Sequence, residues 1–293
     1  MVFTMNKNQE KTKEALAKIE AAVENIHTDA DWLQYLAFQA KFYRYSARNV
    51  LLIRAQNPEA RYVKGYKAWR ELDRFVKKGA KGIAILAPCI KKVEEYKEPA
   101  DKAEYQDKKG EKVTKNVLCG FTVKYVFDIA DTDGSDEHIP VLVKGLSGDS
   151  EDEKALYKRL KAVIAAQGHT IREVTGTASK GSYNIVTGVI AVRSDMEALQ
   201  RVKTLLHEFG HCIDFTMNPD ENISRSHREL VAESVAYIVA SRLGLDTSRY
   251  TSGYLASWGG EAGELAVVAD TAQKVAMKII DTLAESDDFA NLI

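Results

Sequence analysis

Apolar residues recur at intervals of three and four along most of this chain, which is the spacing of one face of a helix. The pattern predicts helices over residues 9–26, 29–45 and 151–167. Two more are predicted in the segments SHRELVAESVAYIVASRLG, which ends at Gly244, and LAVVADTAQKVAMKIIDTL. We therefore expect the C-terminal part of the protein to be mainly helical.

Strand composition replaces the helical spacing in two regions. Residues 82–90 and the segment VLCGFTVKYVFDI, which ends at residue 129, are rich in apolar and β-branched side chains. Residues 91–116 between them are charged and lack apolar periodicity, so we interpret 82–129 as a hairpin with a mobile charged loop at its tip. The segment SYNIVTGVIAVR predicts a second hairpin. These patterns together predict a fold of the α+β class.

The length of 293 residues favours two domains. The polar segment DTDGSDEHIPVLVKGLSGDSEDE is typical of an interdomain connection. We therefore predict an N-terminal α/β domain with antiparallel strands at residues 1–140, and a mainly helical domain with a small β-hairpin at 141–293. The three cysteines form no C-x-x-C motif, so we expect them to be reduced.

The hydropathy of the chain predicts its location. No apolar stretch approaches the roughly 20 residues that span a bilayer. The first residues form a polar helical pattern without the apolar segment of a signal peptide. We expect a cytoplasmic protein with no membrane partner.

The segment KTLLHEFGHCIDF holds two histidines four residues apart, with a glutamate after the first. Positions i and i+4 share a helical face, so His207 and His211 can bind one metal ion. Glu208 can lie beside that ion and, as the catalytic base, take a proton from a bound water. Ser194 and Glu197 predict a capping box that starts this helix. The pattern predicts a zinc hydrolase site, with Mn²⁺ or another divalent ion as the alternative.

A catalytic zinc site has three protein ligands and one open position. The next predicted helix contains E-x-x-x-E, which places Glu229 and Glu233 one turn apart on one face. We predict that Glu229 is the third ligand and that Glu233 orients a histidine through its free N–H, although the reverse assignment stays open. His227, on another helical face, is a further candidate. Gly210 costs about 1 kcal/mol relative to alanine inside a helix, which indicates close packing or function there.

Positive charge is concentrated in residues 41–92. This segment has 14 Lys and Arg against three acidic residues, a surplus of +11, although the net charge of the chain is −1. Aromatic residues lie between the cations, and single-stranded DNA requires cations for its phosphates and rings for its base faces. The predicted DNA-binding residues are Tyr45, Arg48, Arg54, Tyr66, Trp69, Lys77, Lys78 and Lys81. For any single aromatic residue, a place in the core is the competing interpretation.

Two sets of segments, in this order, resemble the ArdC-like antirestriction proteins of plasmids and other mobile elements. The N-terminal set is YSARNVLLIRAQNP, GYKAWRELDRFVKKGAKGIAILAP and YVFDIADTDG, and the C-terminal set is HEFGH, ELVAE and GYLASW. The resemblance implies a single-stranded DNA-binding domain followed by a zincin-like metallopeptidase domain, which is also similar to the ImmA/IrrE metallopeptidases. It implies that His207 and His211 bind the metal, that Glu208 is the catalytic base, and that the ELVAE helix supplies the third ligand. It further implies a role in protecting incoming DNA from restriction.

Three functions are compatible with these patterns. The first is an antirestriction protein that binds single-stranded DNA and carries a zinc metallopeptidase-like site. The second is a regulatory metallopeptidase of the ImmA/IrrE type that acts on a protein substrate. The third is a single-stranded DNA-binding protein whose metal site is not catalytic.

Overall fold

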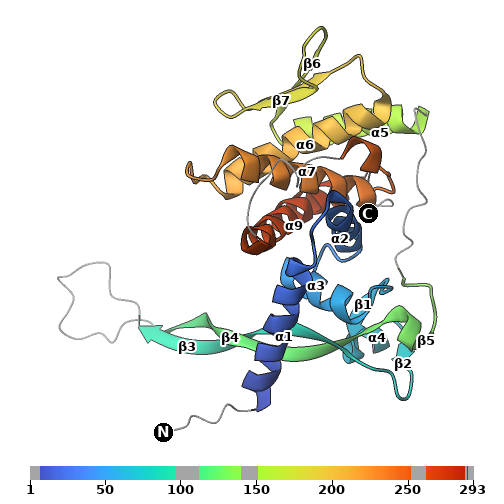
Figure 1. Cartoon of the computed structure of the whole chain (residues 1–293), viewed down its shortest axis with the longest axis vertical. Coiled ribbons are helices and arrows are strands. Elements are labelled where there is room, and N and C mark those ends of the chain that lie inside the picture. Colours follow the sequence, from blue (N-terminus) through green and yellow to red (C-terminus); the bar gives the residue numbers. More distant parts are fainter. Residues whose placement is uncertain (1–6, 97–111, 140–150, 252–261, 288, 290–293) are drawn as a thin grey trace, which may run out of the picture.

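The computed structural model describes residues 7–96, 112–139, 151–251, 262–287 and 289. The N-terminal half consists of α1 (Lys7–Glu24), α2 (Asp29–Lys41), α3 (Ala47–Gln56), β1 (Val63–Gly65), α4 (Tyr66–Arg70), β2 (Arg74–Val76), β3 (Ile83–Tyr96), β4 (Lys112–Asp128), the 3-10 turn η2 (Ile129–Asp131) and β5 (Thr132–Gly134). The C-terminal half consists of α5 (Glu151–Ala166), β6 (Thr170–Val174), β7 (Gly181–Asn184), β8 (Val189–Arg193), α6 (Ala198–Met217), α7 (Arg225–Arg242), the 3-10 turn η3 (Ser248–Tyr250) and α9 (Ala262–Ala284). The protein has the predicted α+β fold, and its helical body lies on one side of a long strand pair (Figure 1). Within the described ranges, no helix has both the length and the apolar character to cross a membrane.

Side-chain caps set the helix boundaries in the N-terminal half. Thr28 and Asp31 form a capping box at the start of α2. The predicted helix over 29–45 is too long, because α2 ends at Lys41 and the Ser46 hydroxyl accepts the amide of Asn49 to start α3. The segment NVLLIRAQNP, for which the sequence predicted no element, forms most of this third helix.

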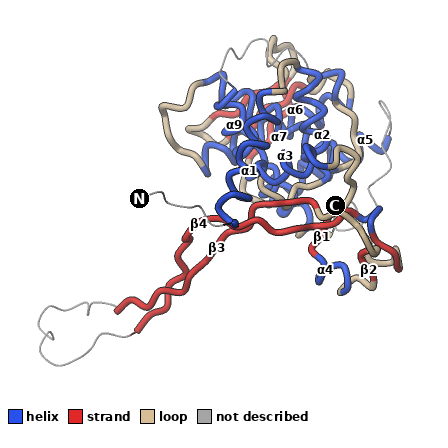
Figure 2. The backbone as a smooth tube through the Cα atoms, turned by 60° about the horizontal axis from the view of Figure 1, so that its bottom comes forward, coloured by secondary structure: helices blue, strands red, loops and turns tan. Residues whose placement is uncertain are grey.

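Strands β3 and β4 form the predicted hairpin, and β1 adds to the free edge of β4 to give the order β1-β4-β3. The two long strands pair from Ile83 to Tyr96, with a bulge after Cys89, and extend away from the helical body (Figure 2). The predicted loop over 91–116 is therefore too wide, because residues 91–96 and 112–116 belong to the strands. Residues 91–94 and 113–116 are all exposed, so both faces of this distal part of the hairpin are solvated and its sequence shows no apolar alternation. Residues 97–111 of that loop lie outside the described residues.

The outer edge of β3 pairs with side chains of α3 instead of another strand. Asn49 donates from its amide nitrogen to the carbonyl of Leu86 (2.9 Å) and accepts from the Leu86 amide (2.8 Å). Gln56 makes the same pair of bonds with Ala84, at 2.9 and 3.0 Å. Because unpaired edge groups invite aggregation, these two amides protect the edge and fix α3 against the sheet.

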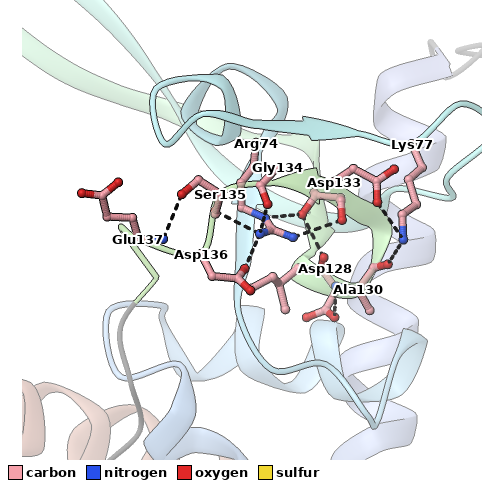
Figure 3. Close-up of polar contacts among 11 residues, drawn as sticks. Arg74, Lys77, Asp128, Ala130, Asp133, Gly134, Ser135, Asp136 and Glu137 are labelled. Atoms are coloured by element: carbon pink, nitrogen blue, oxygen red, sulfur yellow. Dashed lines mark hydrogen bonds and ion pairs between the residues drawn. The ribbon is translucent and has the colours of Figure 1, made fainter.

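Arg74 organises the last part of the N-terminal half (Figure 3). Its buried guanidinium donates to the hydroxyl and carbonyl of Thr132, to the carbonyls of Gly134 and Ser135, and to Asp136. Gly134 has a φ of +142°, and a Cβ at this position would lie 2.2 Å from the Asp73 carbonyl oxygen, so the close pairing of β2 with β5 requires glycine. The predicted interdomain connection thus begins as an ordered turn, and its residues 140–150 lie outside the described residues.

In the C-terminal half, β7 and β8 form the predicted antiparallel hairpin. Strand β6 pairs in parallel with the other edge of β8 and was not predicted. All five residues of β6 are exposed or half-buried, so the segment lacks the apolar alternation that identifies a strand. Strands β7 and β8 lie beside α6, and β6 lies beside α5. Helix α6 in turn packs against α7 and α9.

The N-terminal helices pack against the C-terminal helices. The indole N–H of Trp32 on α2 donates to the Ser234 hydroxyl on α7 (3.2 Å). Gln273 on α9 donates to the carbonyls of Phe42 (3.2 Å), Tyr43 (2.7 Å) and Tyr45 (2.8 Å) at the end of α2. The buried apolar residues of both halves form one cluster. The division into domains at residue 140 stays a prediction, since the two halves share a hydrophobic core.

Candidate functional site

Helix α6 carries the HEFGH segment and begins at Ala198. The predicted capping box is wrong, because Glu197 is the N-cap residue and its side chain makes no cap hydrogen bond. The Glu197 carboxylate instead accepts from Arg249 (2.9 Å) and from the Tyr250 hydroxyl (2.5 Å). Ser194 directly follows β8 and donates to the carbonyl of Val174 at the end of β6 (3.2 Å).

Gly210 allows α6 and α7 to approach closely, as its place inside the helix indicated. A Cβ at this position would lie 3.3 Å from Cγ1 of Val235 and 3.6 Å from Cα of Ala232. The close approach brings the histidine face of α6 against the glutamate face of α7.

Three acceptor atoms converge between these helices. The Nε2 atoms of His207 and His211 are 3.2 Å apart, and Oε2 of Glu229 lies 3.4 Å from the first and 3.6 Å from the second. A tetrahedral zinc ion with bonds of about 2.0–2.1 Å holds its ligand atoms roughly 3.3 Å apart. The separations therefore fit a single divalent ion, and Glu229 rather than Glu233 is the carboxylate grouped with both histidines.

Glu233 contacts His207 at Nδ1, the ring nitrogen that faces away from the three acceptor atoms. Its Oε2 lies 3.1 Å from Nδ1 of His207, and its other oxygen forms an ion pair with the ammonium of Lys203. We assign the proton of neutral His207 to Nδ1 from this contact, which leaves the lone pair of Nε2 directed at the point of convergence. Lys203 also donates to the carbonyl of Tyr250 (2.8 Å), and both charged side chains are buried.

The convergence shifts the pKa values of the site. Burial alone would lower the pKa of His207, but the carboxylates of Glu229 and Glu233 outweigh it and raise the value to about 9. Hydrogen bonds from both histidines hold the pKa of Glu229 far below its usual range. Burial raises the pKa of Glu208, and the neighbouring Glu229 adds to that effect. The ligand group thus attracts a cation, while Glu208 becomes a stronger proton acceptor.

A cavity of about 840 Å³ opens beside the three acceptor atoms. Its walls come from α6, α7, strand β7 and the turn around Tyr250. Glu208 lines it and accepts a hydrogen bond from the backbone amide of Tyr183 on β7. Gly181 on the same strand is so close that a Cβ would lie 2.8 Å from Oε1 of Glu208. The edge strand therefore holds this carboxylate in place.

His227 does not join the ligand group. It lies in the first turn of α7, where its amide donates to the N-cap residue Ser224 (3.2 Å).

Lys203 was not among the site residues predicted from the sequence, although its spacing from the histidines pointed to it. It precedes His207 by four residues, so it lies on the same helical face as both histidines.

The predicted DNA-binding residues divide into two groups. Arg48, Tyr66, Lys77, Lys78 and Lys81 are exposed, and Arg54 is half-buried. Trp69 is fully buried and donates to the carbonyl of Phe127 (2.9 Å), so its burial corrects the prediction that it stacks on bases. Tyr45 is half-buried with its hydroxyl on the carbonyl of Val63 (3.0 Å), which indicates a structural role.

Comparison with known proteins identifies the N-terminal part of the chain. Residues 5–127 match the family described as the N-terminal domain of anti-restriction factor ArdC. This N-terminal part of the chain is similar to the ArdC N-terminal domain. It contains α1 to α4 and the β1-β4-β3 sheet, and the three acceptor atoms lie in the part of the chain beyond that match.

Two solved structures are similar in fold to this chain over most of its length. The metal-free crystal structure of antirestriction ArdC protein from the R388 plasmid is 23% identical, with a TM-score of 0.50 over 82% of this chain and 86% of that one. The Mn(II)-bound structure of the same protein is 20% identical, with a TM-score of 0.53 over 93% of this chain and 96% of that one. At these identities the likeness is one of fold.

A curated relative matches most of the chain in sequence. An uncharacterized protein of Bacillus anthracis is 26% identical over an alignment of 287 residues, and the alignment covers 87% of this chain and 48% of that protein. The chain therefore spans about half the length of the curated relative that it matches.

Proposed function

We propose that this ArdC-like chain is an antirestriction protein that binds single-stranded DNA with its N-terminal half and one divalent metal ion with its C-terminal half. The observation that carries the metal part is the convergence of Nε2 of His207, Nε2 of His211 and Oε2 of Glu229, which lie 3.2 to 3.6 Å from one another. The ArdC match over residues 5–127 supports the DNA part. The proposed role is the protection of incoming DNA in the cytoplasm.

The chemistry of the three converging atoms supports a bound metal ion rather than a proton shared among them. Two imidazole nitrogens and one carboxylate oxygen are ligands that Zn²⁺ takes at catalytic sites. Zinc is our first assignment, and Mn²⁺ is the alternative because a solved ArdC structure is Mn(II)-bound. The separations of 3.2 to 3.6 Å also suit adjacent positions of an octahedral ion, so the geometry accepts either metal.

We propose that the site hydrolyses a peptide bond in a protein substrate. A divalent ion held there would act as a Lewis acid and lower the pKa of a bound water. Glu208 faces the same cavity and is the group available to accept a proton from water there. A structural metal site is closed by its ligands, whereas this one borders a cavity of about 840 Å³. The cavity therefore favours catalysis over a purely structural metal.

Metal analysis with two substitutions tests the metal part. The purified chain should retain one equivalent of Zn²⁺ or Mn²⁺ after dialysis, and His207→Ala should lose it. Glu208→Gln should keep the metal and lose hydrolysis of a quenched fluorescent peptide mixture. Retention of the metal by His207→Ala would exclude this ligand set, and equal hydrolysis by Glu208→Gln would exclude Glu208 as the base.

Binding of a labelled oligothymidylate to the full chain tests the DNA part. Phosphate contacts release counterions, so affinity should fall steeply as salt rises. Matched duplex DNA serves as the control and should bind more weakly. Restriction of incoming DNA in cells that express Glu208→Gln then separates the functions. Full protection by this variant would assign protection to DNA binding alone, and lost protection would require catalysis.

A further inference from the structure

The β1-β4-β3 sheet has two unlike faces near its junction with α4. Val63, Ile83 and Val126 are at most 5% exposed and face the core. Alternate residues of a strand point to opposite faces, so Lys64, Ala84, Tyr125 and Phe127 lie on the other side. The register pairs Lys64 with Phe127 and Ala84 with Tyr125. The second face therefore combines aromatic rings, a cation and small residues.

Aromatic rings form a row on this second face. Tyr66 follows β1 and its ring packs edge-on against Phe127, with centroids 6.4 Å apart. Gly82 lies under the row, because a Cβ there would be 3.0 Å from Cβ of Tyr125 and 3.3 Å from Cζ of Phe127. Tyr66 is 53% exposed and Tyr125 is 46% exposed, so the row is open to solvent at both ends.

Lysines border the row. The ammonium of Lys11 on α1 donates to the Tyr125 hydroxyl (3.1 Å) and lies 5.3 Å from the centre of its ring. Lys64 is the cross-strand neighbour of Phe127 and lies 5.3 Å from the ring centre of Tyr62. Cations beside exposed ring faces complement a ligand that carries both phosphates and flat bases. A duplex hides its base faces by internal stacking, so a single strand fits this surface better.

We infer that single-stranded nucleic acid binds this face of the sheet, with bases stacked on Tyr66, Phe127 and Tyr125 and phosphates held by Lys11 and Lys64. The inference rests on the proposed DNA-binding function and assigns it a surface. Of these five residues, only Tyr66 was among those that the sequence predicted. The buried Trp69 fixes the backbone at Phe127 through its hydrogen bond to the Phe127 carbonyl (2.9 Å).

Binding of a labelled oligothymidylate to variants of the full chain tests the surface. Tyr66→Ala should weaken binding about tenfold, because stacking on one ring is lost, and Tyr66→Phe should bind like the parent. Phe127→Leu keeps apolar bulk without a flat ring and should weaken binding similarly. The matched control is Phe75→Ala on β2, which removes a ring that is 55% exposed outside the row and should leave affinity unchanged.

Salt dependence separates the roles of rings and lysines. Tyr66→Ala should leave the slope of log affinity against log salt unchanged, whereas Lys64→Gln should reduce it by about one unit. Far-ultraviolet circular dichroism verifies that each variant folds. An exposed residue such as Tyr66 can be removed with little effect on the fold.

The outcomes distinguish the inference from the proposed function. If the parent chain binds no single strand, both fail. If it binds single strands and Tyr66→Ala and Phe127→Leu bind equally well, this surface is excluded while the proposed function stands. Equal binding of duplex and single strand by the parent, unaffected by Tyr66→Ala, would exclude base stacking as the mode of recognition.

Discussion

Lys203 and Glu233 form an ion pair between the two helices that carry the metal-ligand group. Lys203 is 7% exposed and Glu233 is 2% exposed. A buried carboxylate without a partner is strongly unfavourable, so Lys203 stabilises the charged form of Glu233. The other oxygen of Glu233 lies 3.1 Å from Nδ1 of His207. Lys203 therefore acts on the ligand group through Glu233, as a positioning residue.

Lys203→Met should weaken metal binding by about tenfold or more, which is the usual effect of losing a group that orients a ligand. The affinity can be measured by competition with a chromogenic chelator. Arg201→Met is the control, since Arg201 lies on the same helix and pairs with Glu173 (2.9 Å) away from the ligands. Equal losses in both variants would show a general effect of helix destabilisation. Lys203→Arg should recover part of the affinity by restoring the charge.

Metal affinity should rise with pH. The pKa of His207 is about 9 in the folded, metal-free protein, against 6.5 for an unperturbed histidine. Its stabilising contribution to that state is fully present below pH 6.5 and is lost as the pH rises through about 9. A metal ion must displace this proton, so apparent affinity should increase about tenfold from pH 7 to pH 8. Calorimetry in buffers of different ionisation enthalpy should show close to one proton released per ion. A metal affinity that does not change between pH 7 and pH 8 would contradict the raised pKa of His207.

Gly181→Ala should reduce peptide hydrolysis while leaving metal binding intact. The new Cβ would lie 2.6 Å from Cγ2 of Thr204 and 2.8 Å from Oε1 of Glu208, so the strand or the carboxylate must move. A displacement near 1 Å at a catalytic group costs on the order of a hundredfold in rate. The control is Thr170→Ala, an exposed residue on β6 at the opposite edge of the same sheet. Unchanged hydrolysis by Gly181→Ala would show that the position of Glu208 is not critical.

Asn49→Leu should lower the free energy of unfolding by about 1–3 kcal/mol, because it leaves the amide and carbonyl of Leu86 without their partner at the sheet edge. Urea denaturation followed by circular dichroism measures the change. The control is Arg48→Leu, an exposed neighbour on the same helix, for which we expect a change within about 0.5 kcal/mol. A loss in Asn49→Leu no larger than in Arg48→Leu would show that water replaces the amide at the edge.

Elements with regular apolar spacing could be predicted from the amino-acid sequence. Helices α1, α5 and α7 lie within one or two residues of their predicted starts, and the β3–β4 and β7–β8 hairpins form as predicted. The spacing of four residues between His207 and His211 places them on one helical face in any helix. These features depend on local geometry, which neighbouring residues specify.

Contacts between segments that are distant in the sequence could not be predicted in this way. Glu229 and Glu233 are equivalent in the sequence pattern, and only the packing of α6 on α7 places one beside both Nε2 atoms and the other behind His207. Trp69 has an aromatic side chain of the type that stacks on bases, but it is buried in the fold. Phe127 lies about sixty residues from Tyr66 and meets it through the pairing of β1 with β4. Such contacts arise from burial and register across the fold, and the local sequence does not contain that information.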